Sequence, residues 1–315
     1  MVVSLTRQSS LLATLFAIGV IVTSFVRLSY APFDFELAEY GYLPEWWESS
    51  LSAVLLLATA LVIGRTTVKC GAFPSFCTLP ISLFALVACG IYLSPESLTS
   101  ASVALLTAFG VMSLLNTLAD FGNREKLFFA SLCFGTAAVV YPPCVVMLAL
   151  LPVAIATFPL NLRQSIVAIV GWLLPFATLS YVVWYMGYDI DAFAQHLWHR
   201  IITSRGEFSL VPFPYAATVV AALLVSVLLM GIVVVQRARY TSLVSPRKFM
   251  EMELLLSFLT VAALALPGCG VAMLPVIGVP MSVVAAYTLD NMWSRAGSIL
   301  YWLLLVGVFA HIFLN

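Results

Sequence analysis

Charge is scarce in this chain. Only 9% of its 315 residues are Asp, Glu, Lys or Arg, whereas 63% are hydrophobic; a soluble domain carries about 25% charged residues. A surface with so little charge does not stay dispersed in water, so the composition indicates a protein whose solvent is lipid. The 14 basic residues balance the 14 acidic residues and form no basic stripe, which excludes nucleic acid as a partner.

The chain also lacks the residue patterns of metal and redox sites. It has six cysteines but no Cys-x-x-Cys pair, and most of the cysteines lie in apolar runs, where we expect small buried side chains. His196 and His199 are not spaced as in the His-Glu-x-x-His pattern, and a metal there would need a third ligand such as Asp34, Asp189 or Asp191. The sequence therefore predicts no metal and no cofactor.

What the chain does have is a series of long apolar runs. A membrane-spanning helix needs about 20 apolar residues, and continuous runs exclude the alternating strands of a membrane barrel. The predicted spans are 11–27, 51–65, 73–93, 100–118, 127–141, 144–160, 165–187, 213–236, 251–267, 271–288 and 297–314. We therefore predict an all-α polytopic transmembrane helical bundle of about eleven spans, within a range of about nine to twelve. Residues 1–315 form a single integral membrane domain.

Lys and Arg orient these spans, because basic loops stay on the cytoplasmic side. With the N-terminus inside, eleven of the 14 basic residues fall in inner loops, and nine of the 14 acidic residues fall outside. Residues 127–160 must then cross twice, with Pro142 and Pro143 as the outer turn; otherwise the basic inner loop 237–250 would lie outside. A re-entrant pair is the alternative. The first run also resembles a signal peptide, but we expect an uncleaved helix and a multi-pass protein of the inner (cytoplasmic) membrane.

The first outer loop, 28–50, gathers five of the acidic residues. Glu48, followed by two serines, is predicted to cap the next helix. Asp34 and Glu36 alternate with Phe33, Phe35 and Leu37, which favours a position against the membrane surface. A carboxylate in such a place can act as a general base. The alternative is an ordinary solvated loop that is acidic because the bases are retained inside.

The second outer loop, 188–212, predicts an amphipathic helix that lies on the outer leaflet. Asp191 is its expected N-cap. Helical spacing places Phe193, Leu197 and Ile201 on an apolar stripe. The opposite face carries two imidazoles and a guanidinium, with another guanidinium just beyond, a set that can bind a phosphate; these residues are His196, His199, Arg200 and Arg205. The alternative is a surface helix whose basic residues contact anionic lipid.

Three stretches resemble a family of multi-pass membrane proteins of unknown function from Bacteroidota. They are Asn123-Arg124-Glu125, the segment FFASLCFGTAAVVYPP from Phe128 to Pro143, and GWLLPF from Gly171 to Phe176. The resemblance covers about the middle third of the chain. It implies a membrane protein and no particular activity.

The architecture is also similar to that of the GT-C superfamily of membrane glycosyltransferases. Asp34 and Glu36 match, as Asp-x-Glu, the acidic motif that this superfamily carries just after its first helix. The resemblance implies that these two residues are catalytic and that His196, His199, Arg200 and Arg205 bind a polyprenyl-phosphate-linked sugar. The loop that holds the acidic motif is shorter than in typical members.

Two other functions remain open on the sequence alone. Short loops suit a non-enzymatic subunit or assembly partner of an envelope complex, with another membrane protein as its partner. The stretch 267–280, rich in Gly and Pro, resembles the broken helices of transporters and suits a carrier of lipids or small molecules. The predicted spans hold almost no ionisable residue, which argues against ion coupling.

Overall fold

The computed structural model describes residues 14–23, 45–69, 73, 78–90, 97–119, 123–150, 161–202, 215–238, 244–264, 266, 269, 273–291 and 294–314. These residues are helical apart from short connections, and each predicted span contains a described helix. After a helix at Thr14–Thr23, the elements are α2 (Glu45–Lys69), α3 (Leu79–Gly90), α4 (Ser97–Ala119), α5 (Arg124–Val140), η3 (Pro142–Ala149), α7 (Leu162–Tyr185), α8 (Ile190–Ile202), α9 (Tyr215–Ala238), α10 (Val244–Ala263), α11 (Leu274–Asn291) and α12 (Ser294–Leu314).

The described helices differ in whether they can cross a membrane alone. Three are long and apolar enough to do so: Trp47–Lys69, Leu98–Thr117 and Leu162–Tyr185. Others are apolar but shorter; α3, for example, has 12 residues, a rise of about 18 Å against a hydrocarbon core of about 30 Å. The all-α prediction is confirmed, and the apolar helices indicate a membrane protein. The predicted count of about eleven spans is not shown, because only three described helices are long and apolar enough to cross alone.

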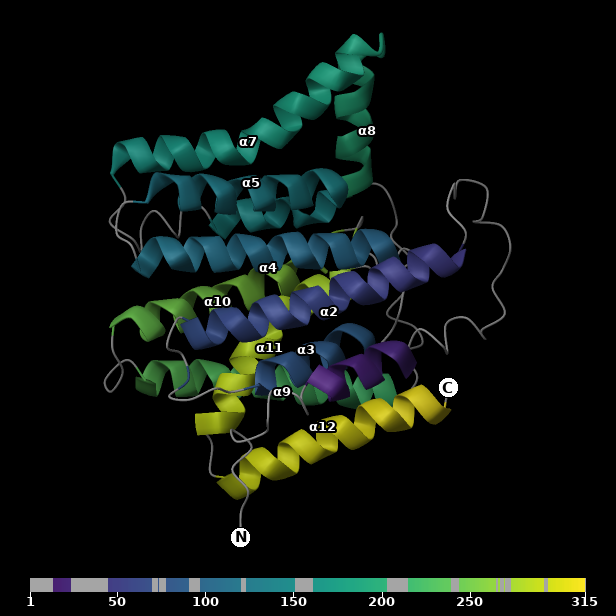
Figure 1. Ribbon diagram of the computed structural model, residues 1–315, viewed down its shortest axis with the longest axis vertical. Coiled ribbons are helices and arrows are strands. Elements are labelled where there is room, and N and C mark those ends of the chain that lie inside the picture. Colours follow the sequence, from purple (N-terminus) through teal and green to yellow (C-terminus); the bar gives the residue numbers. More distant parts are fainter. Residues whose placement is uncertain are drawn as a thin grey trace.

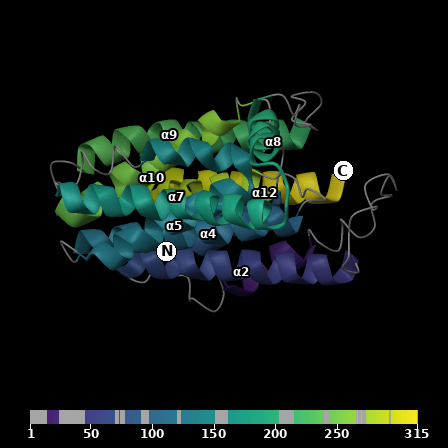
Figure 2. The same cartoon turned by 90° about the horizontal axis from the view of Figure 1, so that it is seen from above.

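Helix α11 forms the centre of the bundle. Its residues from Leu274 to Leu289 are all buried, and it packs against α3, α9, α10 and α4. A glycine allows α3 to pack closely on α11. The side chain of Phe84 in α3 lies 3.4 Å from the position that a Cβ atom on Gly278 would take. Figures 1 and 2 show the other helices running alongside one another around this core, with the exception of α8.

Helices α5 and α7 pack side by side and run in the same direction. A Cβ atom on Gly171 of α7 would lie 2.8 Å from the carbonyl oxygen of Phe128, early in α5. Further along, a Cβ atom on Gly135 of α5 would collide with the carbonyl oxygen of Trp172 and lie 3.2 Å from Pro175. The contacts advance together along both helices. The chain between them therefore returns to the end at which α5 began, as both the predicted double crossing of 127–160 and its alternative, a re-entrant pair, require.

The chain reverses at Tyr141. Its backbone N–H donates to the Ala137 carbonyl at 2.9 Å and closes α5. Pro142 and Pro143 then open η3, a 3-10 helix, at positions where a missing N–H leaves no hydrogen bond unmade. The two prolines thus form the turn that the sequence analysis assigned to them.

Basic residues gather at one end of the bundle, which we call the basic end. Figure 1 shows α2 ending there, on the left, and α5, α7 and α10 beginning there. The basic residues within these helix ends are Arg65, Lys69, Arg124, Lys126, Arg163, Arg247 and Lys248. The start of α2 and the whole of α8 lie at the opposite end, which we call the α8 end. The segregation matches the distribution from which the sequence analysis derived its inner and outer sides.

Candidate functional site

The residues predicted to form a site divide into two groups. Asp34, Glu36 and Arg205 lie outside the residues that the structure describes. His196, His199 and Arg200 belong to α8, whose backbone is described, although their side chains are not. The pairing of carboxylates with phosphate-binding cations therefore stays a prediction, but the element that carries three of the cations has a defined position.

A tight corner sets the direction of α8. Gly187 adopts a left-handed conformation, with φ of 79°, and its N–H donates to the Trp184 carbonyl at 2.9 Å. The N–H of Tyr188 reaches back to the Val183 carbonyl at 3.1 Å. This pair of bonds is the Schellman motif, which ends a helix with a glycine because only glycine adopts that conformation without strain. It turns the chain so that α8 runs crosswise to the bundle helices (Figures 1 and 2).

Two predicted caps are corrected by the structure. Asp191 was expected at the N-cap of α8, but Asp189 takes that role: its Oδ1 accepts from the Asp191 N–H at 3.0 Å, and its carbonyl accepts from the Phe193 N–H at 3.1 Å. An aspartate readily caps the residue two positions ahead. Glu48 was expected as the cap of α2, but that helix already begins at Glu45, so Glu48 lies in its first turn.

Exposed aromatic side chains occur on several elements at the α8 end. They are Trp47 at the start of α2, Tyr181, Trp184 and Tyr185 in the last turns of α7, Tyr188 in the corner and Trp198 on α8 itself. Tyr181 and Trp184 contact each other with ring centroids 5.9 Å apart. Aromatic rings with one apolar side and one polar edge concentrate at the headgroup level of membranes. The exposure of so many at one end is typical of a helix at a membrane surface, as predicted for α8.

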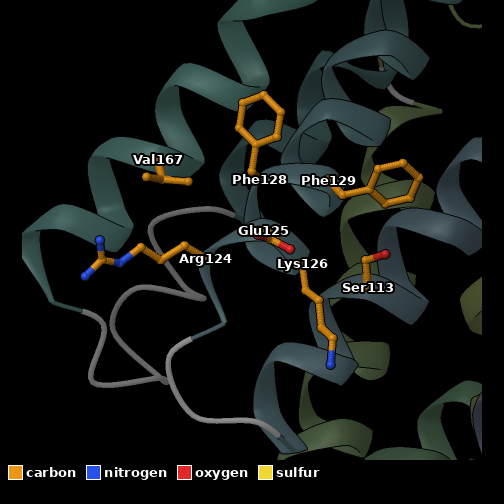
Figure 3. A pocket seen from close by; sticks show the side chains of 7 residues that line it. All are labelled: Ser113, Arg124, Glu125, Lys126, Phe128, Phe129 and Val167. Atoms are coloured by element: carbon orange, nitrogen blue, oxygen red, sulfur yellow. The ribbon is translucent and has the colours of Figure 1, made fainter.

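A cavity of about 520 Å³ lies at the basic end, far from α8 along the helices. Its apolar wall is formed by Phe128 and Phe129 of α5 and Val167 of α7, with Ser113 of α4 beside them. The first turn of α5 borders it with Arg124, Glu125 and Lys126, and Figure 3 shows the two basic side chains pointing apart with the glutamate between them. The sequence analysis identified no site here. An apolar wall next to charged side chains suits a ligand that has both an apolar chain and a charged group.

The sequence analysis also overlooked Glu253. This residue lies inside the predicted span 251–267, yet the spans were described there as almost free of ionisable residues. It is only 2% exposed, and its carboxyl Oε2 has no hydrogen-bond partner. Ser257 and Thr260, one and two turns further along the same face of α10, are also buried. The one signal in the sequence was an acidic residue within an apolar run, two residues past Glu251.

No cation at the same depth accompanies Glu253 among the described helices that pack on α10. Those helices are α11, η3, α9 and α4, and within their bounds only Arg237 and Asp290 are charged. Both stand in a last turn, at the basic end. On α10 itself, Arg247 pairs with Glu251 at 3.1 Å. A lone carboxylate is unstable in an apolar interior, so the group suits a bound proton or small cation.

Comparison with known proteins adds no relative. No family model, no curated protein and no solved structure matches the chain. The resemblances to the Bacteroidota family and to the GT-C superfamily therefore gain no support from these comparisons. Within the described part of the chain, no group of three or more His, Cys, Asp and Glu residues is placed to hold a metal ion.

Proposed function

We propose that this protein is an integral membrane transferase that acts on a phosphate-bearing lipid, of the polyprenyl-phosphate-sugar class, at the headgroup level of the α8 end. The observation that carries the proposal is the position of α8. It lies across the end of the bundle at which α2 begins, and the loop with Asp34 and Glu36 joins α2 at Glu45. The proposal pairs the carboxylates of the loop before α2 with the basic residues of α8, and it is supported by the position of α8 at the end where α2 begins (Figure 1).

The chemistry needs both groups. When an acceptor hydroxyl attacks the anomeric carbon, a new C–O bond forms while the bond to the phosphate oxygen breaks, and the phosphate leaves with the electron pair. Arg200, His196 and His199, with Arg205, would stabilise that charge, and Asp34 or Glu36 would accept the hydroxyl proton. In this proposal the basic end faces the cytoplasm and the α8 end faces outward, across the inner membrane.

The transferase is tested by replacing one group of each kind. Membranes that hold the Asp34→Asn or the Arg200→Ala variant are expected to transfer labelled sugar from a polyprenyl-phosphate donor at least about 100-fold more slowly than wild type, the usual contribution of a general base or an anion-stabilising group. The measurement is label incorporated into lipid-free acceptor, normalised to the amount of protein in the membrane.

Two matched variants control for charge and accumulation. Glu48→Gln removes an acid at the same end, within the first turn of α2, and Arg163→Ala removes an arginine at the basic end; both should leave transfer unchanged. Full activity in Asp34→Asn and in Arg200→Ala would overturn the proposal, as would a wild-type protein that transfers no sugar from any polyprenyl-phosphate donor.

A second candidate function is that of a carrier coupled to protons or small cations. The buried carboxyl of Glu253, whose Oε2 has no hydrogen-bond partner, favours it, because ionisable groups inside a membrane bundle mark ion and proton pathways. The break between α10 and α11 is also a transporter feature. In this case Glu253 exchanges its proton or cation with water during the transport cycle.

A hydrophobic carbodiimide, which reacts with buried protonated carboxyls, tests this exchange. Wild-type protein in its membrane should acquire an adduct on Glu253, detected by peptide mass spectrometry, and the yield should fall as the pH is raised. Glu253→Gln should give no adduct, whereas Glu251→Gln, which removes the acid paired with Arg247, should label like wild type. An unlabelled Glu253, or labelling that ignores pH, would show a sealed side chain and exclude the carrier.

A further inference from the structure

Sulfur atoms from distant parts of the chain meet inside the bundle, in what we call the sulfur cluster: Cys144, Cys269 and Met273. The Cys144 thiol donates to the Met273 Sδ atom at 3.9 Å across 129 residues of sequence. The Cys269 thiol lies close enough to Cys144 for the two groups to interact electrostatically. All three side chains are buried, with at most 1% of their surface exposed. Neither cysteine is in a disulfide bond.

The cluster lies where two irregular pieces of backbone meet. Cys144 is in the first turn of η3, the 3-10 helix that follows the Tyr141 reversal. Cys269 and Met273 belong to the connection between α10 and α11, and η3 packs on α10. Non-helical backbone at membrane depth is tolerated only where it is enclosed by protein or lines a cavity. The 3-10 helix η3 and the connection before α11 therefore meet in the protein interior, where Cys144 contacts Met273.

Neighbouring side chains support the cluster from both sides. Tyr141 and Cys269 share a side-chain hydrogen bond. Met147 follows Cys144 by three residues, and because a 3-10 helix has three residues per turn, the two lie on one edge of η3. The Thr107 hydroxyl of α4 contacts the Met147 Sδ atom at 4.0 Å. The sulfur atoms are thus held by contacts from α4, η3 and the connection before α11.

The sulfur ligands determine which metal ion the cluster would prefer. Thiolate and thioether sulfur favour Cu(I) over harder ions. Zinc would require four ligands, and within the described residues no group of three or more His, Cys, Asp and Glu is placed to hold a metal. Two sulfur atoms about 2.3 Å from one ion in trigonal geometry lie about 4 Å apart, close to the 3.9 Å between Cys144 and Met273.

We propose that Cys144, Cys269 and Met273 bind one Cu(I) ion, with Met147 beside them on η3. The site is independent of the proposed transferase, whose residues lie on other elements. Binding displaces the protons of both thiols, because thiolates are the ligands, so the affinity should rise with pH. The ion would join η3 to the start of α11.

The test is an anaerobic titration of the purified full-length chain in detergent with Cu(I), in competition with the chromophoric chelator bicinchoninate. Wild-type protein should withdraw one Cu(I) per chain from the chelator, and X-ray absorption should show sulfur as the only ligand type. Cys144→Ser and Cys269→Ser should each lose this copper, and Met273→Leu should hold it more weakly.

Cys133→Ser is the matched control, because Cys133 is a free, buried cysteine of α5 outside the sulfur cluster. It should bind copper like wild type. Thermal unfolding and size-exclusion elution of the copper-free variants separate lost ligands from lost structure. Retention of one Cu(I) by the Cys144→Ser/Cys269→Ser double variant would overturn the proposal. So would a wild type that withdraws none, or a disulfide between the two cysteines that persists after reduction.

Discussion

Gly135→Leu is expected to abolish accumulation of the protein in membranes. A side chain at Gly135 would collide with the Trp172 carbonyl oxygen and press against Pro175. Backbone atoms of a packed helix cannot move aside as a flexible side chain can, so α7 would be forced away from α5. Overpacking costs about 1–3 kcal/mol where side chains can give way, and we expect at least about 3 kcal/mol at this contact. Thermal unfolding in detergent and membrane yield are the measurements.

The same substitution where space is open provides the control. A Cβ atom on Gly19, in the helix Thr14–Thr23, meets nothing within 4 Å. Gly19→Leu should therefore accumulate and unfold like wild type, although both variants place a leucine at a helical glycine. Equal behaviour of Gly135→Leu and Gly19→Leu would contradict the close packing of α5 on α7.

Cysteines introduced at the two ends of the bundle should differ completely in their accessibility to a thiol reagent added outside the cell. Arg124→Cys and Arg163→Cys, which begin α5 and α7, should react with a membrane-impermeant thiol reagent only after the cells are opened. Tyr188→Cys, in the exposed corner before α8, should react in intact cells. The reason is that α5 and α7 run parallel and begin at the basic end, which we expect to stay in the cytoplasm because basic residues are retained there. Labelling of the unsubstituted chain gives the background.

The pattern of labelling separates two errors. Arg124→Cys and Arg163→Cys on opposite sides of the membrane would contradict the return of the chain between α5 and α7. The same two variants labelled together in intact cells would show the bundle to be inverted. Inversion would move α8 to the cytoplasmic face and exclude a transferase that acts outside.

The apolar runs located the helices because continuous apolar sequence in lipid leaves the backbone no partners except its own. The helix ends were harder to predict, since they depend on individual hydrogen bonds. The ninth predicted span began at residue 251, but α10 begins at Val244, because helix continues through the basic loop past Pro246. Likewise, the N-cap of α8 falls on Asp189 because the corner at Gly187 ends two residues earlier than the amphipathic pattern alone indicated.

The candidate sites were less predictable than the helices. Periodicity identified α8 as amphipathic, but its crosswise direction depends on the left-handed Gly187. Glu253 is visible in the sequence, yet whether an acid near a helix start is solvated or buried depends on the rotation of α10 within the bundle. The contact of Cys144 with Met273 joins segments 129 residues apart, and no local pattern predicts such a pairing. Each of these features is a product of tertiary packing.

The 3-10 conformation of η3 affects the distance that the chain covers between α5 and α7. Residues 142–160 number 19, against 17 in α5, and they connect the end of α5 to the start of α7. A 3-10 helix rises about 2.0 Å per residue and an α-helix about 1.5 Å. The eight residues of η3 therefore extend about 16 Å instead of about 12 Å. Rewinding η3 as an α-helix would shorten this element by about 4 Å. The pitch of η3 thus adds to the distance that the chain covers before α7 begins.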